Sequence, residues 1–141
     1  MADEIVVNNG KAEITLDELG MTQPGMARLM AEIGPRMHRL YYAAQAQNWP
    51  LARYFWKESR TIFEIATVVR PKYDENMTKF LDEQYAPLGK AIEAKDFASF
   101  EALFAEMVSQ ANAYHELYEK PYLRWQLPAT PPADLDLTPR G

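Results

Sequence analysis

The chain has 141 residues, of which 48% are hydrophobic and 25% charged, and it contains no cysteine. This is the composition of one globular domain, and without thiols the chain can form no disulfide, zinc-thiolate site, iron–sulfur cluster or thioether-attached haem. The formal net charge of −5 argues against a general nucleic-acid-binding protein. No apolar run reaches the roughly 18 residues of a membrane span, so we expect no membrane partner.

Residues 1–21 form a polar arm. Its two apolar patches, residues 5–7 and 14–16, are too short to be independent elements. We expect the arm to lie on the surface, with the patches paired as a short strand. The first residues include acids where a secretory signal needs bases, so the sequence predicts a cytoplasmic protein.

The first predicted helix begins at Thr22, which can cap it, and it carries Pro24 near its first turn. Gly34 and Pro35 interrupt the helix without shifting the phase of its apolar stripe, which predicts a kink and not a break. Spacings of three and four define the stripe, which consists of Met26, Leu29, Met30, Ile33, Met37, Leu40, Tyr41 and Ala44. His38 is expected to point partly outward.

The second predicted helix begins after Asn48 and ends at Arg70, because the residue before Pro71 disfavours helical geometry. Its predicted core stripe is Leu51, Phe55, Ile62, Ile65, Ala66 and Val69, widened by Trp56 and Phe63. The third helix spans about residues 74–94, with a kink at Pro87. Asp96 caps the fourth, whose stripe is Phe100, Leu103, Phe104, Met107, Val108, Ala111, His115 and Tyr118.

The connections between these helices are short, so consecutive helices should lie antiparallel. The sequence therefore predicts an all-α fold, an antiparallel up-down-up-down four-helix bundle over residues 22–120. Five of the ten prolines fall in residues 121–141, which predicts an extended C-terminal tail. Tyr122, Leu123, Trp125 and Leu127 suggest that its first half packs on the bundle, whereas the end from Thr130 is expected to be loose.

Charge is segregated along the chain. Residues 28–72 contain eight bases and three acids, whereas residues 73–141 contain six bases and twelve acids. The simpler interpretation is two solvated halves of opposite charge that attract each other weakly. The alternative is a basic surface for an anionic partner.

Motifs of familiar enzymes are missing. Neither His38 nor His115 has a glutamate three residues before it, as di-iron bundles require. There is no glycine-rich phosphate loop and no HExxH, and the serines of the helical segments lack a glycine-flanked elbow. The sequence therefore favours a non-catalytic protein.

Five segments resemble a known family. They are 29–32 (LMAE), 44–52 (AQAQNWPLA), 86–96 (APLGKAIEAKD), 111–115 (ANAYH) and 127–132 (LPATPP). In their order and spacing they resemble the small helical-bundle cytochromes related to class II cytochrome c′. In one group of these, a Cys-x-x-Cys-His motif near the end of the last helix is followed by a proline-rich tail.

The chain departs from this pattern at both cysteine positions, which are Ala111 and Tyr114, and keeps only His115. Neither alanine nor tyrosine can add to a haem vinyl group. The resemblance therefore predicts a degenerate relative without covalent haem and with no cofactor as the leading expectation.

Three functions remain open for the segment around His115. The first is non-catalytic: a small hydrophobic or aromatic ligand, or a protein partner, at a remodelled cofactor pocket. The expected lining residues are His115, Tyr114, Ala111, Met37, Tyr41, Phe104 and Trp56. The second is non-covalent (b-type) haem held by His115 and Met30 or Met26. The third is a cofactor-free enzyme with His115 and Tyr114 as acid and base.

A purely structural role is the alternative to all three. Methionines at helical spacing usually fill cores, and Tyr114 with the neighbouring aromatic side chains could occupy the volume of a porphyrin. His115 would then hydrogen-bond to Glu32 or to a carbonyl of the tail.

A homodimer through the first two helices is also expected. The resemblance implies this pairing, and the broad apolar face of the second helix, with Tyr54, Trp56 and Phe63, offers area for a second copy. The alternative is that the arm and tail cover these aromatic side chains within one chain.

Overall fold

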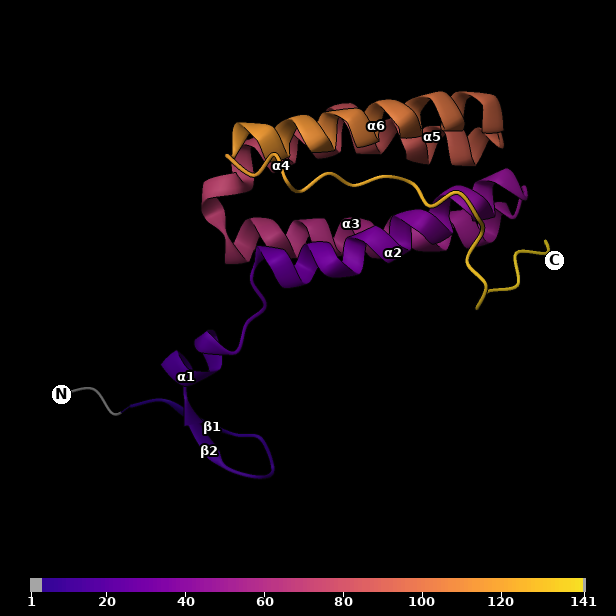
Figure 1. Ribbon diagram of the computed structural model, residues 1–141. Helices are drawn as coiled ribbons and strands as arrows, with labels where there is room; N and C mark the ends of the chain where they lie inside the picture. The colour runs from indigo at the N-terminus through magenta and orange to yellow at the C-terminus, as the bar shows by residue number, and fades with distance from the viewer. Residues whose placement is uncertain (1–3, 141) are drawn as a thin grey trace.

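The computed structural model describes residues 4–140 and is mostly helical, with one small two-stranded sheet (Figure 1). The elements are β1 (Val6–Asn8), β2 (Glu13–Thr15), α1 (Leu16–Met21), α2 (Met26–Gln45), α3 (Trp49–Val69), α4 (Asp74–Phe80), α5 (Ala86–Ala94) and α6 (Phe97–Leu117). Within the described residues, no helix is both long enough and apolar enough to cross a bilayer. The predicted helical class is confirmed.

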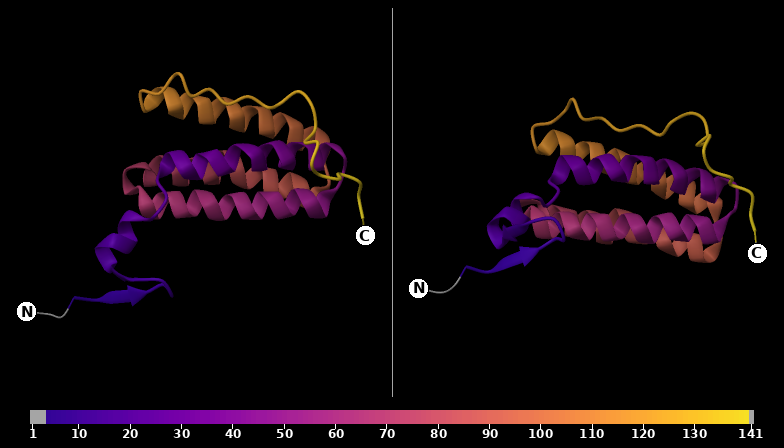
Figure 2. Two further views of the ribbon diagram at one scale, coloured as in Figure 1. Left: turned by 60° about the horizontal axis from the view of Figure 1, so that its bottom comes forward. Right: turned by 90° about the horizontal axis from the view of Figure 1, so that it is seen from below.

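The arm forms a hairpin and a short helix. Strands β1 and β2 pair antiparallel with Val7 opposite Ile14, and Thr15 with Glu18 closes a capping box at the start of α1. The pairing of the two apolar patches is thus confirmed. However, the arm projects away from the helices (Figures 1 and 2), so the expectation that it lies on their surface is wrong.

Helix α2 begins later than its sequence pattern indicates. Its N-cap is Gly25, which provides no side-chain cap. Thr22, the predicted cap, instead follows α1 and donates from its hydroxyl to the Leu19 carbonyl. From Met26 onward α2 continues through Pro35 without a break.

The predicted starts of α3 and α6 are confirmed, and a capping side chain fixes each of them. The Asn48 side chain accepts from the Leu51 N–H at the start of α3, and Asp96 accepts from the Ser99 N–H at the start of α6. Helix α3 ends at Val69, directly before the Arg70–Pro71 pair.

The third helical segment contains a π turn over Leu81–Tyr85, between α4 and α5. Pro87 has no N–H to offer the Glu83 carbonyl, and the preceding turn widens so that the Ala86 N–H donates to the Leu81 carbonyl, five residues earlier. The irregularity expected from Pro87 therefore takes the form of one wider turn.

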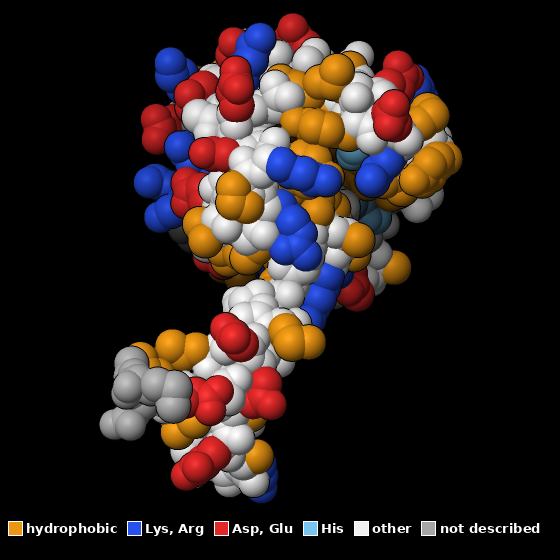
Figure 3. All heavy atoms as spheres, turned by 90° about the vertical axis from the view of Figure 1, so that its left-hand side faces the viewer, with side chains coloured by type: hydrophobic (Ala, Val, Ile, Leu, Met, Phe, Trp, Pro, Cys, Tyr) orange, Lys and Arg blue, Asp and Glu red, His pale blue; other side chains and the backbone are white. Residues whose placement is uncertain are grey.

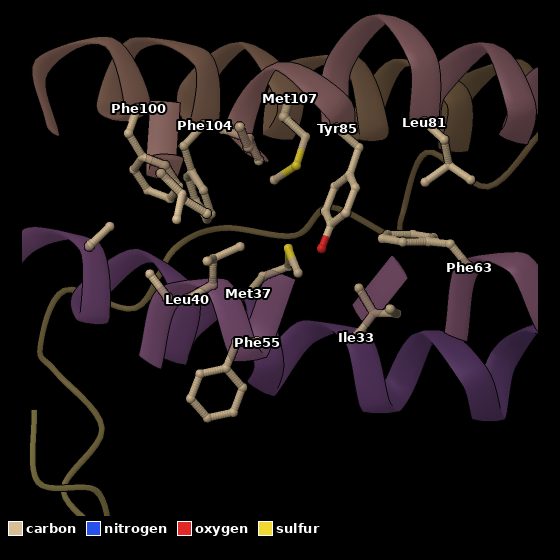
Figure 4. Packing of buried hydrophobic residues seen from close by; sticks show 14 of the residues in the cluster. Ile33, Met37, Leu40, Phe55, Phe63, Leu81, Tyr85, Phe100, Phe104 and Met107 are labelled. Atoms are coloured by element: carbon tan, nitrogen blue, oxygen red, sulfur yellow. The ribbon is translucent and has the colours of Figure 1, made fainter. Parts of the chain in front are cut away.

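The core lies where α2 and α3 face α5 and α6 (Figure 4). In Figure 4, Met37 and Leu40 of α2 face Phe104 and Met107 of α6, and the Tyr85 ring lies beside Met37 and Met107, directed toward the opposite helices. Ile65, which the periodicity assigned to the core, is 41% exposed, so that assignment is wrong. The Ile65 side chain lies on the face of α3 that is exposed to solvent.

The tail after α6 is an extended strap on the seam between α2 and α6 (Figures 1 and 2). Trp125 and Leu127 pack against the core, as expected, but Tyr122 and Leu123 are exposed. Leu135 and Leu137 also pack against the core. The expectation of a loose end after Thr130 is therefore wrong.

Candidate functional site

The segment that resembles a haem-attachment motif holds the tail. On α6, the Asn112 amide binds both backbone groups of Trp125, with each bond 2.9 Å long. One turn later, His115 Nδ1 lies 2.7 Å from the Leu123 carbonyl. Since a carbonyl only accepts, this nitrogen carries the proton. The interpretation in which His115 binds a tail carbonyl is confirmed.

Helix α2 holds the next part of the tail in the same way. The Tyr42 hydroxyl donates to the Pro128 carbonyl at 2.7 Å, and His38 Nε2 donates to the Thr130 carbonyl at 2.8 Å. Both histidines of the chain thus bind backbone carbonyls of the tail. An extended segment rich in proline has few donors of its own, so its carbonyls are the groups available to bind.

The end of the tail is fixed near the far end of α2. Asn48 Nδ2 donates to the Leu137 carbonyl at 3.3 Å, and Arg39 forms an ion pair with Asp134 at 2.8 Å. The tail therefore runs parallel to α2, from Trp125 beside Gly34 to Leu137 beside Asn48.

Trp125 fills the seam between α2 and α6. A methyl group added at Gly34 of α2 would lie 3.1 Å from the indole nitrogen, and the indole packs edge-on against Phe104 of α6, with ring centroids 6.3 Å apart. The indole thus occupies space between the two helices that carry Met30 and His115, the residues proposed from sequence as axial ligands.

The residues expected to line a ligand pocket pack against each other. Met37 and Phe104 are 4% and 2% exposed, and Ala111 is half-buried against the same cluster. Tyr41 packs on Phe104, with ring centroids 5.1 Å apart. The structure therefore brings these residues together as core.

The Tyr41 hydroxyl has a specific partner at the edge of this cluster. It donates to Glu101 Oε2 at 2.7 Å. Burial of the ring, followed by the bond to the Glu101 carboxylate and its negative charge, raises the pKa of Tyr41 to about 12. The phenol is therefore a hydrogen-bond donor at neutral pH and a poor general base.

Trp56 belongs to a different part of the core. Its indole nitrogen donates to the Tyr85 carbonyl at 3.1 Å, and the Tyr85 hydroxyl donates to the Trp56 carbonyl at 2.6 Å. The two rings stack with an interplanar angle of 5°. Gly89 permits this arrangement, because a Cβ there would lie 2.5 Å from the indole. Burial also raises the pKa of Tyr85.

Tyr114 and His115 are directed to different neighbours. Tyr114 is half-buried and meets Phe80 edge-on at 6.3 Å, whereas His115 binds the Leu123 carbonyl. The geometry does not pair the two groups as the acid and base of one site.

Two grooves lie beside α2. One, of about 420 Å³, runs between α2 and α3 and is lined by Ala31, Glu32, Pro35, Arg36, Arg39, Tyr54 and Phe55. The other, of about 410 Å³, runs between α2 and the tail and is lined by Met30, Ala31, Gly34, Pro35, His38, Trp125 and Pro128. Of the residues expected to line a pocket or ligate haem, only Met30 contributes to either groove.

The residues present do not fit the haem that the family resemblance implies. Covalent attachment lacks both thiols. One feature favours a non-covalent haem: His115 Nδ1 donates to the Leu123 carbonyl. In metal-binding histidines, such a bond commonly orients the imidazole so that the other nitrogen can ligate the metal. Against it, Trp125 fills the α2–α6 seam and Tyr114 packs on Phe80, so a porphyrin there would have to displace both. Among residues 4–140 there is no cluster of three or more acidic, histidine or cysteine side chains suited to a metal ion.

No family model, curated protein or solved structure matches this chain.

Sequence reasoning missed the residues that organise the site. Asn112 is 7% exposed and Tyr85 is fully buried, yet neither was expected in the core. A buried asparagine needs partners, and its position in the apolar phase of α6 was a usable signal. No local pattern could show that the partner is the backbone of Trp125.

Proposed function

We propose that this chain is a non-catalytic interaction protein built on an antiparallel up-down-up-down four-helix bundle of the cytochrome c′ type. In this architecture α2, α3, the α4–α5 segment and α6 are the four helices. The short connections between them and the packing of α5 against both α3 and α6 support it.

One observation carries the choice of a binding role over a cofactor or catalytic role. The side chains expected to surround a ligand fill the interior themselves, and the tail covers the seam between α2 and α6. The outer face of α2 and α3 stays accessible, and it carries a groove of its own.

A second copy of the chain is the partner that suits this surface. Tyr54 is 56% exposed and lines the groove together with Pro35. Glu32 and Arg36 line the same groove and pair with each other at 3.8 Å, so this face carries no excess of either charge. An exposed aromatic side chain beside a groove of balanced charge suits contact with the same face of a second copy.

Sedimentation velocity of the purified chain over a range of concentrations tests this proposal. We expect a monomer–dimer equilibrium that Tyr54→Glu shifts strongly toward monomer, because it removes the aromatic anchor and adds a charge. Tyr122→Glu is the matched control, since Tyr122 is 76% exposed on the tail and outside the groove. A wild-type monomer at all concentrations, or equal effects of the two substitutions, would contradict the proposal.

A further inference from the structure

The arm, residues 4–21, exposes several of its large apolar side chains to solvent. None of its residues is buried, and Met21, Ile5, Val6 and Leu16 are 85%, 63%, 49% and 48% exposed. An isolated two-stranded hairpin is marginally stable in water at best. The arm therefore has the character of a segment that packs on another surface.

The charge of the arm indicates what kind of surface this is. The described arm contains four acids and one base, Lys11. Neither Glu13 nor Asp17 takes part in any ion pair found among residues 4–140. The complementary surface should therefore combine exposed apolar groups with bases.

The end of the helical body from which the arm leaves has this combination. Ile65 and Val68, in the last turns of α3, are 41% and 76% exposed. The adjoining chain carries Arg70 and Lys72, and the Arg70 guanidinium lies against Gly25 at the start of α2, which brings Arg28 to the same end. Figure 3 views this end: Lys and Arg side chains lie across the body above the point where the acidic arm joins it, and Asp and Glu side chains lie around them.

We propose that the arm of one copy docks on this end of a second copy, with its apolar side chains against Ile65 and Val68 and its acids against Arg28 and Lys72. The arm points away from its own body (Figure 1), so the docking occurs between copies. Because the arm leaves from the end that receives it, a two-fold axis beside this end lets both arms be exchanged at once. The inference rests on the proposed self-association and gives it a second, separable contact.

Charge reversal in the full-length chain tests the exchange. The arm variant is Glu13→Lys with Asp17→Lys, and the body variant is Arg28→Glu with Lys72→Glu. All four positions are exposed, and an acid in the first turn of α2 suits the helix dipole. Each variant alone should dimerise at least about tenfold more weakly than wild type at low salt, and about 0.5 M salt should reduce the difference.

Mixing the two variants is the decisive step. In a mixed dimer both contacts again pair opposite charges, so the mixture should dimerise about as well as wild type, although each variant alone does not. Glu93→Lys with Glu106→Lys, exposed on α5 and α6, is a control with the same change in net charge as the arm variant and should leave the dissociation constant unchanged.

The outcomes separate this inference from the proposed function. If Tyr54→Glu weakens the dimer but the reversed variants and their mixture behave like wild type, the arm exchange is wrong and the pairing through α2 and α3 stands. If the variants weaken association but the mixture does not restore it, the arm does not dock on a second copy. A wild-type chain that stays monomeric contradicts both.

Discussion

Asn112 and Trp125 are joined by two hydrogen bonds, in which the Asn112 amide donates to the Trp125 carbonyl and accepts from the Trp125 N–H. The Asn112 side chain thus binds the N–H and the carbonyl of one tail residue, as an adjacent β-strand would. It satisfies two backbone groups at the point where the indole enters the seam between α2 and α6. This pairing anchors the first half of the tail.

Asn112→Ala should lower the free energy of unfolding by about 1–3 kcal/mol, because it leaves both half-buried backbone groups of Trp125 without a partner. Asn112→Asp keeps the acceptor and loses the donor, so it should retain part of this stability. Denaturant titration followed by tryptophan fluorescence measures both. Ser109→Ala, at an exposed position of the same helix, should have no comparable effect, and an equal loss there would argue against a specific role for Asn112.

Gly89→Ala should destabilise the chain by about 1–3 kcal/mol, because the new methyl group meets the Trp56 indole at 2.5 Å and forces α5 away from α3. The gain in helix propensity offsets part of this loss. Gly20→Ala in α1 is the control, since a Cβ there meets nothing within 4 Å. Thermal unfolding of the two variants would show whether α3 and α5 approach as closely as the structure indicates; equal midpoints would contradict it.

Tyr85→Phe should cost about 1–3 kcal/mol, since the Trp56 carbonyl loses the hydroxyl that donates to it inside the core. Ser59 provides a matched comparison. Its hydroxyl is fully buried and has no hydrogen bond among residues 4–140, so Ser59→Ala should be neutral or stabilising. Urea unfolding of the two variants would contradict this account if Ser59→Ala were the more damaging change.

Alkaline pH should destabilise the folded chain through Tyr41. Its pKa is about 12 in the folded state and about 10 when unfolded, so its contribution is fully present below about pH 10 and is lost as the pH rises toward 12. Tyr41→Phe should therefore show a weaker fall in the urea midpoint between about pH 10 and pH 12. Parallel curves for the variant and wild type would show that the Tyr41 pKa is not raised.

Local signals in the sequence predicted much of the helical framework. Asn48 and Asp96 cap helices through bonds to N–H groups three residues away, and Pro71 stops α3 by its own geometry. Such features need no knowledge of the rest of the chain. Thr22 was misassigned because a threonine between two helices can serve either one, and here it closes α1.

Features that depend on distant segments were not predicted. The tail has no periodicity, and its contacts join residues such as His38 and Thr130, which are 92 positions apart. Ile65 has the spacing of a core residue. The apolar face of α3 is broad, however, and the packing of the other helices decides which part of that face is buried. For the same reason, the residues around His115 suggested a ligand pocket, whereas the structure places the tail beside them.

Titration with haemin, followed by absorbance near about 410 nm, tests most directly whether this interior is filled by its own side chains. The account predicts that wild type and His115→Ala give the same weak, non-saturating spectra, because Trp125 and Tyr114 occupy the space beside His115. A sharp band that saturates at one haem per chain and disappears in His115→Ala would contradict it.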